Sequence, residues 1–111
     1  MISPEKMAEY RRTAQKRQAT AVAKLDERFA LGQTIARELA DLLRADFGAE
    51  QVFLFGSLTD RDLFHTRSDI DLAAWGIAEG RYLAAVAAVT GHQTAFSVDL
   101  VRLVETEGIA L

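Results

Sequence analysis

Asp69 and Asp71 are the residues whose type and spacing could best do chemistry. They alternate with Ile70 and Leu72, and alternation of polar with apolar residues is typical of a half-buried strand. Residues i and i+2 of a strand share one face and lie roughly 7 Å apart. Two carboxylates on a rigid strand can bind a hard cation through oxygen. The segment therefore predicts a divalent-metal site.

The Asp-x-Asp spacing alone is weak support for that site. The chain contains eight aspartates and repeats the spacing at Asp60 and Asp62, so one such match is expected nearly by chance. The second pair lies in a polar stretch without alternating apolar residues. We expect Asp60 and Asp62 to be solvated acids of a loop or a helix terminus.

A third carboxylate follows the same strand pattern. In the segment 96–101, Phe96, Val98 and Leu100 fall on one face, whereas Ser97 and Asp99 fall on the other. The segment is either a strand with one incidental polar residue or a strand that brings Asp99 beside the other two acids. Three clustered carboxylates repel one another, so they need a metal to stay ionised together.

A glycine and a serine end the apolar run 52–55. Gly56 permits unusual backbone angles and close approach of a phosphate, and Ser57 adds a hydroxyl and an N–H group. If a helix begins here, its free N–H groups and dipole favour an anion. The alternative is a plain strand-to-helix turn. The segment is not a P-loop, because no Gly-Lys-Ser/Thr follows.

The remaining elements would position these residues. A helical pattern runs from Ser3-Pro4 to Phe47, with Gly48 as its stop. Strands are expected at 51–55, 69–76 and 95–102, a helical turn in the loop 58–68, a second helix at 79–89, and a short helical tail at 103–108. The fold class is therefore α+β, with a small mixed sheet and helices packed on one face.

The first helix would be about 65 Å long at 1.5 Å per residue, which exceeds a domain of this size. It must break near residues 18–24, or its first part must project; we favour a projecting arm over residues 1–20. This arm carries a net charge of +3 against −6 for the rest of the chain. A basic arm could contact an acidic partner or RNA, or could be a solvated helix face.

Composition excludes several classes of protein. At 111 residues we expect one domain, and the absence of Cys excludes a disulfide framework and a thiolate zinc site. The sequence shows neither an apolar stretch of about 20 residues nor a signal peptide, so we expect a cytoplasmic protein without membrane contact. A net charge of −3 gives no overall basic field for nucleic acid.

The order of these motifs resembles the DNA polymerase beta-like nucleotidyltransferase superfamily, and within it the minimal nucleotidyltransferases. The likeness covers about residues 25–107: an apolar strand with Gly56-Ser57, a spacer, Asp69-x-Asp71, and a later strand with Asp99. The chain departs from the family in the loop after Ser57, which lacks the usual small residues. The resemblance implies a nucleotidyltransferase domain over residues 21–111.

The resemblance also implies roles for these residues. Asp69, Asp71 and Asp99 would be the catalytic, Mg²⁺-binding carboxylates, and Asp99 could instead accept a proton from the acceptor. Gly56, Ser57 and Ser68 would bind the phosphates of ATP. The acceptor would be a tyrosine of a HEPN-domain ribonuclease toxin, held in a hetero-oligomer, and the chain would be its antitoxin.

Two other functions stay open. The chain could be an antitoxin that neutralises its partner by contact alone, or, less in keeping with its size, an enzyme that modifies a small molecule. Among other residues, His65 and His92 are expected on the surface without metal. Arg61 and Arg67 are either phosphate contacts or ordinary surface charge, and Trp75 either stacks on a base or fills the core.

Overall fold

The computed structural model describes residues 1–105, and its dominant feature is one unbroken helix, α1 (Pro4–Phe47). The side chain of Ser3 caps its start by accepting a hydrogen bond from the Lys6 N–H at 3.2 Å. Gly48 ends it with a φ of 72°, a left-handed conformation that glycine adopts without steric cost, and its N–H bonds to the Leu43 carbonyl. Both expected helix boundaries are confirmed.

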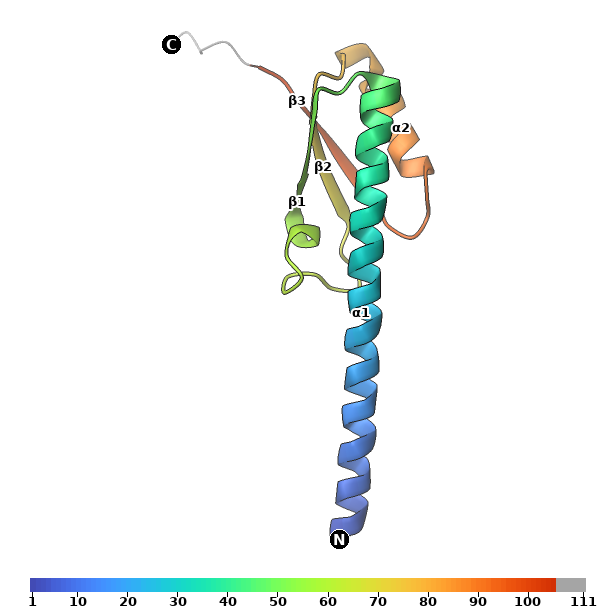
Figure 1. Ribbon diagram of the computed structural model, residues 1–111, viewed down its shortest axis with the longest axis vertical. Helices are drawn as coiled ribbons and strands as arrows, with labels where there is room; N and C mark the ends of the chain where they lie inside the picture. The colour runs from blue at the N-terminus through green and yellow to red at the C-terminus, as the bar shows by residue number, and fades with distance from the viewer. Residues whose placement is uncertain (106–111) are drawn as a thin grey trace, which may run out of the picture.

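The first half of α1 projects from the body of the protein (Figure 1). Its buried residues begin only at Gly32, and the molecule measures 73 Å along its longest axis. Residues 4–24 of α1 are almost entirely exposed. They extend beyond the arm expected at residues 1–20, and from here on the arm means residues 4–24. Of the two alternatives, the helix does not break near residues 18–24, and its first part projects as we favoured. No helix within residues 1–105 is both long enough and apolar enough to cross a bilayer.

A three-stranded mixed sheet forms the body. Its strands are β1 (Gln51–Phe55), β2 (Ile70–Trp75) and β3 (Val98–Leu103), in the spatial order β1-β2-β3. β1 pairs antiparallel with β2, and β3 pairs parallel with β2. The parallel pair requires a crossover, which the 3₁₀ helix η2 (Glu79–Arg81) and the helix α2 (Tyr82–Gly91) provide.

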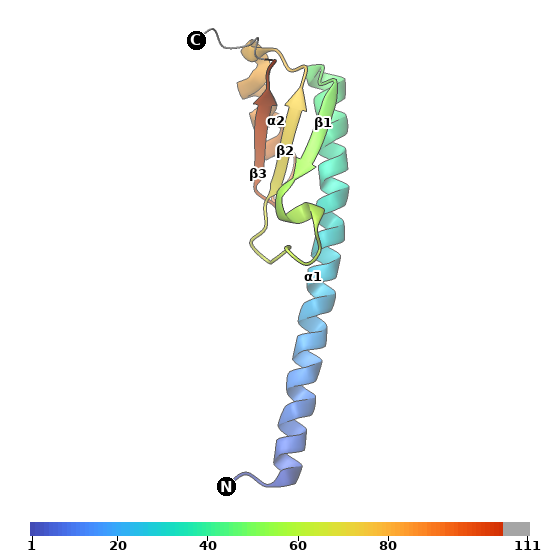
Figure 2. The same ribbon diagram turned by 90° about the vertical axis from the view of Figure 1, so that its left-hand side faces the viewer.

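Within residues 1–105, helices cover only one face of this sheet, as Figure 2 shows with the strands in front of both helices. α1 contacts β1 and α2 contacts β3. The core therefore lies between the sheet and the two helices, where Leu39, Leu43, Ile70, Leu72 and Val89 are fully buried. This arrangement confirms the expected fold class, an α+β domain with helices on one face.

Some element boundaries differ from expectation. β2 is one residue shorter at each end. β3 begins at Val98, three residues later than expected, and runs to Leu103, which continues the ladder opposite Trp75. The expected helical tail at 103–108 is wrong where it can be assessed, since Leu103 is in the strand and residues 104–105 are not helical. The rest of that tail lies outside the described residues.

Candidate metal and nucleotide site

Asp71 and Asp99 face each other across neighbouring strands. They are register partners in the parallel ladder of β2 and β3, and they lie close enough for the charge of Asp99 to act on Asp71. Both lie on the face of the sheet that no helix of residues 1–105 covers, because the residues on either side of them, Ile70, Leu72 and Leu100 among them, turn into the core. The alternation in the sequence thus correctly predicted which side each acid takes.

Asp69 completes the cluster from the residue just before β2. It is exposed, and the backbone beside it is held because the Ile70 N–H donates to the Ser97 carbonyl at 2.9 Å. Asp69 lies close enough to Asp71 for its negative charge to act on that carboxyl. Asp69 and Asp99 therefore both lie near Asp71, although the three acids do not converge on one point.

The surroundings of Asp71 raise the pKa of its carboxyl above the ordinary value. Burial is the largest cause, because it disfavours the charged form. The negative charges of Asp99 and Asp69 follow, and the hydrogen bond with Asp99 adds to them. The crowding of negative charge around Asp71 therefore disfavours ionisation of its carboxyl group.

Gly56 brings the backbone directly against Asp71. Its φ is 78°, and a Cβ atom added there would collide with Asp71 Oδ2. Phe55, the residue before it, is the register partner of Asp71 on β1. No other residue type fits this position without strain or displacement of the carboxylate. The group that lies against Gly56 is therefore Asp71, and the close approach of a phosphate remains a prediction.

Ser57 and Ser68 connect the glycine turn to the start of β2. Ser57 Oγ donates to Ser68 Oγ at 2.7 Å, and the His65 N–H donates to the same oxygen at 2.9 Å. Ser68 is only 4% exposed, and its own N–H donates to the His65 carbonyl at 3.0 Å. This geometry lets Ser68 fix the loop that carries Asp69. Phosphate contacts by Ser57 and Ser68 remain predictions.

No extended helix begins at the glycine. Residues 56–59 form the short 3₁₀ helix η1 (Gly56–Thr59), which the Thr59 hydroxyl closes by donating to the Gly56 carbonyl at 2.7 Å. η1 has a single turn and does not present the row of aligned N–H groups that a long helix has. The anion site expected at the start of a helix is therefore absent at residues 56–59, and only the N–H groups of this single turn could contact an anion.

The acid cluster suits a hard divalent cation in its chemistry. It offers carboxylate oxygens and an excess of negative charge that a cation would neutralise. Within residues 1–105, however, no three His, Cys, Asp or Glu side chains converge closely enough to hold a metal as they stand. Binding would need these side chains to move closer together.

Exposed aromatic residues lie on the same face as the acids; Trp75 was considered for the site from the sequence, whereas Phe53 and Phe55 were not. Phe53 and Phe55 on β1 are 47% and 42% exposed, and Trp75 is partly exposed at the far end of β2. A sequence signal existed: β1 is apolar at every position except Gln51, so both its faces favour burial, although only one is buried here. Trp75 shares the aspartate face and does not fill the main core.

Other candidate residues are engaged elsewhere. Arg61 pairs with Asp26 at 2.5 Å, and Asp60 Oδ1 accepts from the Asp62 N–H at 3.0 Å in an exposed turn. His65 and His92 are exposed, and His92 Nε2 lies 3.0 Å from Glu38 Oε2. Both histidines are surface residues, as expected.

A groove of about 440 Å³ lies on the opposite, helix-covered side of the sheet, between α1 and β1. It does not include Asp69, Asp71 or Asp99.

No protein family, curated protein or solved structure matches this chain, so the case for the site rests on its own residues.

Proposed function

We propose that the protein is a Mg²⁺-dependent nucleotidyltransferase that moves AMP from ATP to a hydroxyl of a partner protein. One observation carries the proposal: Asp71 and Asp99 lie in register on one open sheet face, with the Gly56 backbone against Asp71. A glycine turn that phosphates could approach, beside paired carboxylates, suits the transfer of a nucleotidyl group. Catalysis of such a transfer depends on positioning and charge neutralisation.

Asp69, Asp71 and Asp99 would hold the cation, which would neutralise charge on the triphosphate and on the oxygens that enter and leave. The acceptor oxygen forms a bond to the α-phosphorus, and the bond to pyrophosphate breaks. Asp99 is the more exposed acid of the register pair, so it can take the acceptor's proton. Gly56 keeps the turn open to the phosphates.

The proposed acceptor is a tyrosine of a HEPN-domain ribonuclease, which modification would inactivate; the chain would then act as its antitoxin. This part rests on the resemblance in motif order. The open face of the sheet supports access by a protein acceptor, since no residue within 1–105 covers Asp99.

A second candidate is an antitoxin that acts by contact alone. Two observations favour it: the carboxylates in the described part of the chain do not converge as a ready metal site, and the arm exposes Met7, Tyr10 and Val22. Such a protein would bind its partner without ATP.

Neutralisation of the ribonuclease separates the two candidates. We would mix the HEPN protein with wild-type or Asp69→Asn protein, with Mg²⁺ and with or without ATP, and measure RNA cleavage and the intact mass of the ribonuclease. The transferase predicts ATP-dependent neutralisation with added AMP, lost in Asp69→Asn and kept in the surface control Asp62→Asn. Neutralisation that survives Asp69→Asn without added mass would contradict it.

A further inference from the structure

We propose that the arm of one molecule packs across the open sheet face of a second copy, and that the second copy returns the same contact. Both surfaces lack a partner within the described chain. Together they would turn each two-layer body into a three-layer sandwich, with α1 of the second copy as the missing layer.

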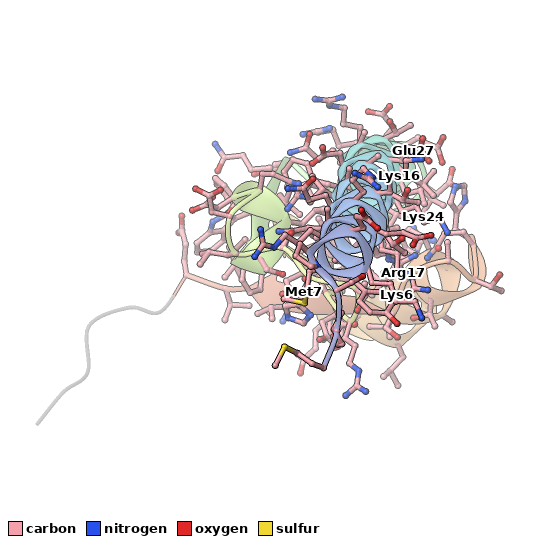
Figure 3. All side chains as sticks on the ribbon, turned by 90° about the horizontal axis from the view of Figure 1, so that it is seen from below. Lys6, Met7, Lys16, Arg17, Lys24 and Glu27 are labelled. Carbon is pink, nitrogen blue, oxygen red and sulfur yellow. The ribbon has the colours of Figure 1, made fainter. Side chains whose placement is uncertain are left out.

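The arm has an apolar stripe that continues the core-facing side of α1. Met7, Tyr10, Ala14 and Ala21 follow one another at steps of three, four and seven, and the stripe continues into the buried positions Gly32, Leu39 and Leu43. Because the spacing is helical, the stripe faces the side on which its own sheet lies. Figure 3, seen along the helix, shows Met7 on that side and Lys16 on the opposite side.

The open face of the sheet is apolar at one end and acidic at the other. Its side chains form three rows across the strands, which are Phe55–Asp71–Asp99, Phe53–Ala73–Val101 and Gln51–Trp75–Leu103. Phe53 and Val101 in the middle row are 47% and 45% exposed. The open-face positions of the three strands include no basic residue.

A two-fold rotation can bring the arm of each molecule onto the open sheet face of the other, with no change in the conformation of either molecule. The axis runs across the strands, at the level of the sheet, near the base of the arm. Rotation about it places each arm over the other molecule's open face, since each arm stripe faces the side of its own sheet. Residues 4–24 extend about 31 Å, and a strand of six residues extends about 20 Å, so the arm can cover all three rows.

Charge complementarity supports packing of the arm on the sheet of the second copy, and not on the second copy's arm. Lys6, Arg17 and Lys24 gather along one flank of the arm, as Figure 3 shows. That flank lies toward α2, which packs under β3. Rotation about an axis that runs across the strands leaves positions along that axis unchanged. The basic flank would therefore lie toward β2 and β3 of the second copy, where Asp71 and Asp99 are. Two arms paired antiparallel would instead place this basic flank against itself.

Both surfaces are accessible to a partner, because residues 4–24 are almost entirely exposed and Phe53 and Val101 of the open face are 47% and 45% exposed. A stable interface buries roughly 1,200–2,000 Å² in total over both partners. In this dimer the arm also covers the acid row Phe55–Asp71–Asp99, so ligands would reach that row only after the arm leaves.

Introduced cysteines test the contact directly, because the natural chain has none. Two separately purified variants, Ala14→Cys and Val101→Cys, would be mixed and mildly oxidised without ATP or Mg²⁺. The proposal predicts a cross-linked species at twice the chain mass of 12.2 kDa. Lys16→Cys, on the back of the arm, is the matched control and should cross-link slowly to Val101→Cys. The test is independent of transferase activity.

Two results would overturn the proposal. One is a wild-type chain that light scattering finds monomeric at the highest soluble concentration. The other is an Ala14→Cys variant that links mainly to itself, which indicates paired arms.

A charge reversal provides a second test that does not depend on cysteine reactivity. The double variant Arg17→Glu/Lys24→Glu should raise the dimer Kd by roughly tenfold or more. The control Arg12→Glu/Lys16→Glu makes the same change on the far side of the helix and should leave the Kd nearly unchanged. Equal effects of the two double variants would contradict the contact. Circular dichroism would confirm that both remain folded.

Discussion

Asp71 and Asp99 are register partners across two parallel strands, and burial together with the charges of Asp99 and Asp69 raises the pKa of the Asp71 carboxyl. Either a proton or a bound cation would reduce the repulsion between these carboxylates. Protons and cations should therefore compete for the cluster.

The first prediction concerns pH and stability. Because the folded state raises the pKa of Asp71, folding binds a proton there more tightly than the unfolded chain does. This contribution to stability is complete below the ordinary aspartate pKa of 3.8 and is lost as pH rises through the raised value. Asp71→Asn should therefore raise the Tm at pH 7 in the absence of metal, and the gain should vanish near pH 3.8. A lower Tm for Asp71→Asn than for the wild type at pH 7 would contradict the view that the charged Asp71 destabilises the folded protein.

The second prediction concerns metal. Mg²⁺ at ten times its Kd should stabilise the wild-type protein by about 1.4 kcal/mol, and by less as the pH falls and protons compete for the carboxylates. Scanning calorimetry with and without Mg²⁺ measures this directly. The double variant Asp71→Asn/Asp99→Asn should show no such gain, whereas Asp62→Asn, outside the cluster, should respond as the wild type does.

The third prediction concerns the glycine turn. Gly56→Ala forces a left-handed residue to carry a Cβ that collides with Asp71. The conformation alone costs about 1–2 kcal/mol, which lowers the Tm by roughly 4–8 °C per kcal/mol in a domain of this size. Gly80→Ala is a suitable control, because the space around Gly80 is open. If Gly56→Ala left both the Tm and Mg²⁺ binding intact, the close approach would have no functional role.

The fourth prediction concerns the buried hydroxyl of Ser68. Ser68→Ala leaves the His65 N–H and the Ser57 hydroxyl without their acceptor, which should cost about 1–3 kcal/mol of unfolding free energy in urea. Ser97→Ala, at an exposed position, should cost little. Equal and small losses in the two variants would show that water replaces the network.

Local patterning was sufficient to predict the strands and the side each aspartate takes. Ile70 and Leu72 alternate with Asp69 and Asp71, and that period of two fixes the faces once one face is buried. Likewise, Ser3-Pro4 and Gly48 mark the ends of α1 because capping depends on neighbouring residues.

Features that depend on residues far apart in sequence could not be predicted. The register that opposes Asp71 to Asp99 is set by strand pairing across the α2 crossover. The contact of Gly56 with Asp71 depends on that sheet as well, and the hydrogen bonds of Ser68 depend on the path of the loop. The exposure of Phe53 arises because no helix in the described part of the chain covers that face, and no local sequence pattern determines this.

Transfer of label from ATP to the partner tests the central claim most directly. ATP labelled in its α-phosphate would be incubated with Mg²⁺, the HEPN-domain protein, and either wild-type or Asp71→Asn protein, with γ-labelled ATP as the control for phosphate transfer. We predict label on the partner only from α-labelled ATP, with the rate reduced at least about 100-fold in Asp71→Asn. No label with the wild-type protein, or equal label with both proteins, would contradict the assignment of Asp71 and Asp99 as a catalytic pair.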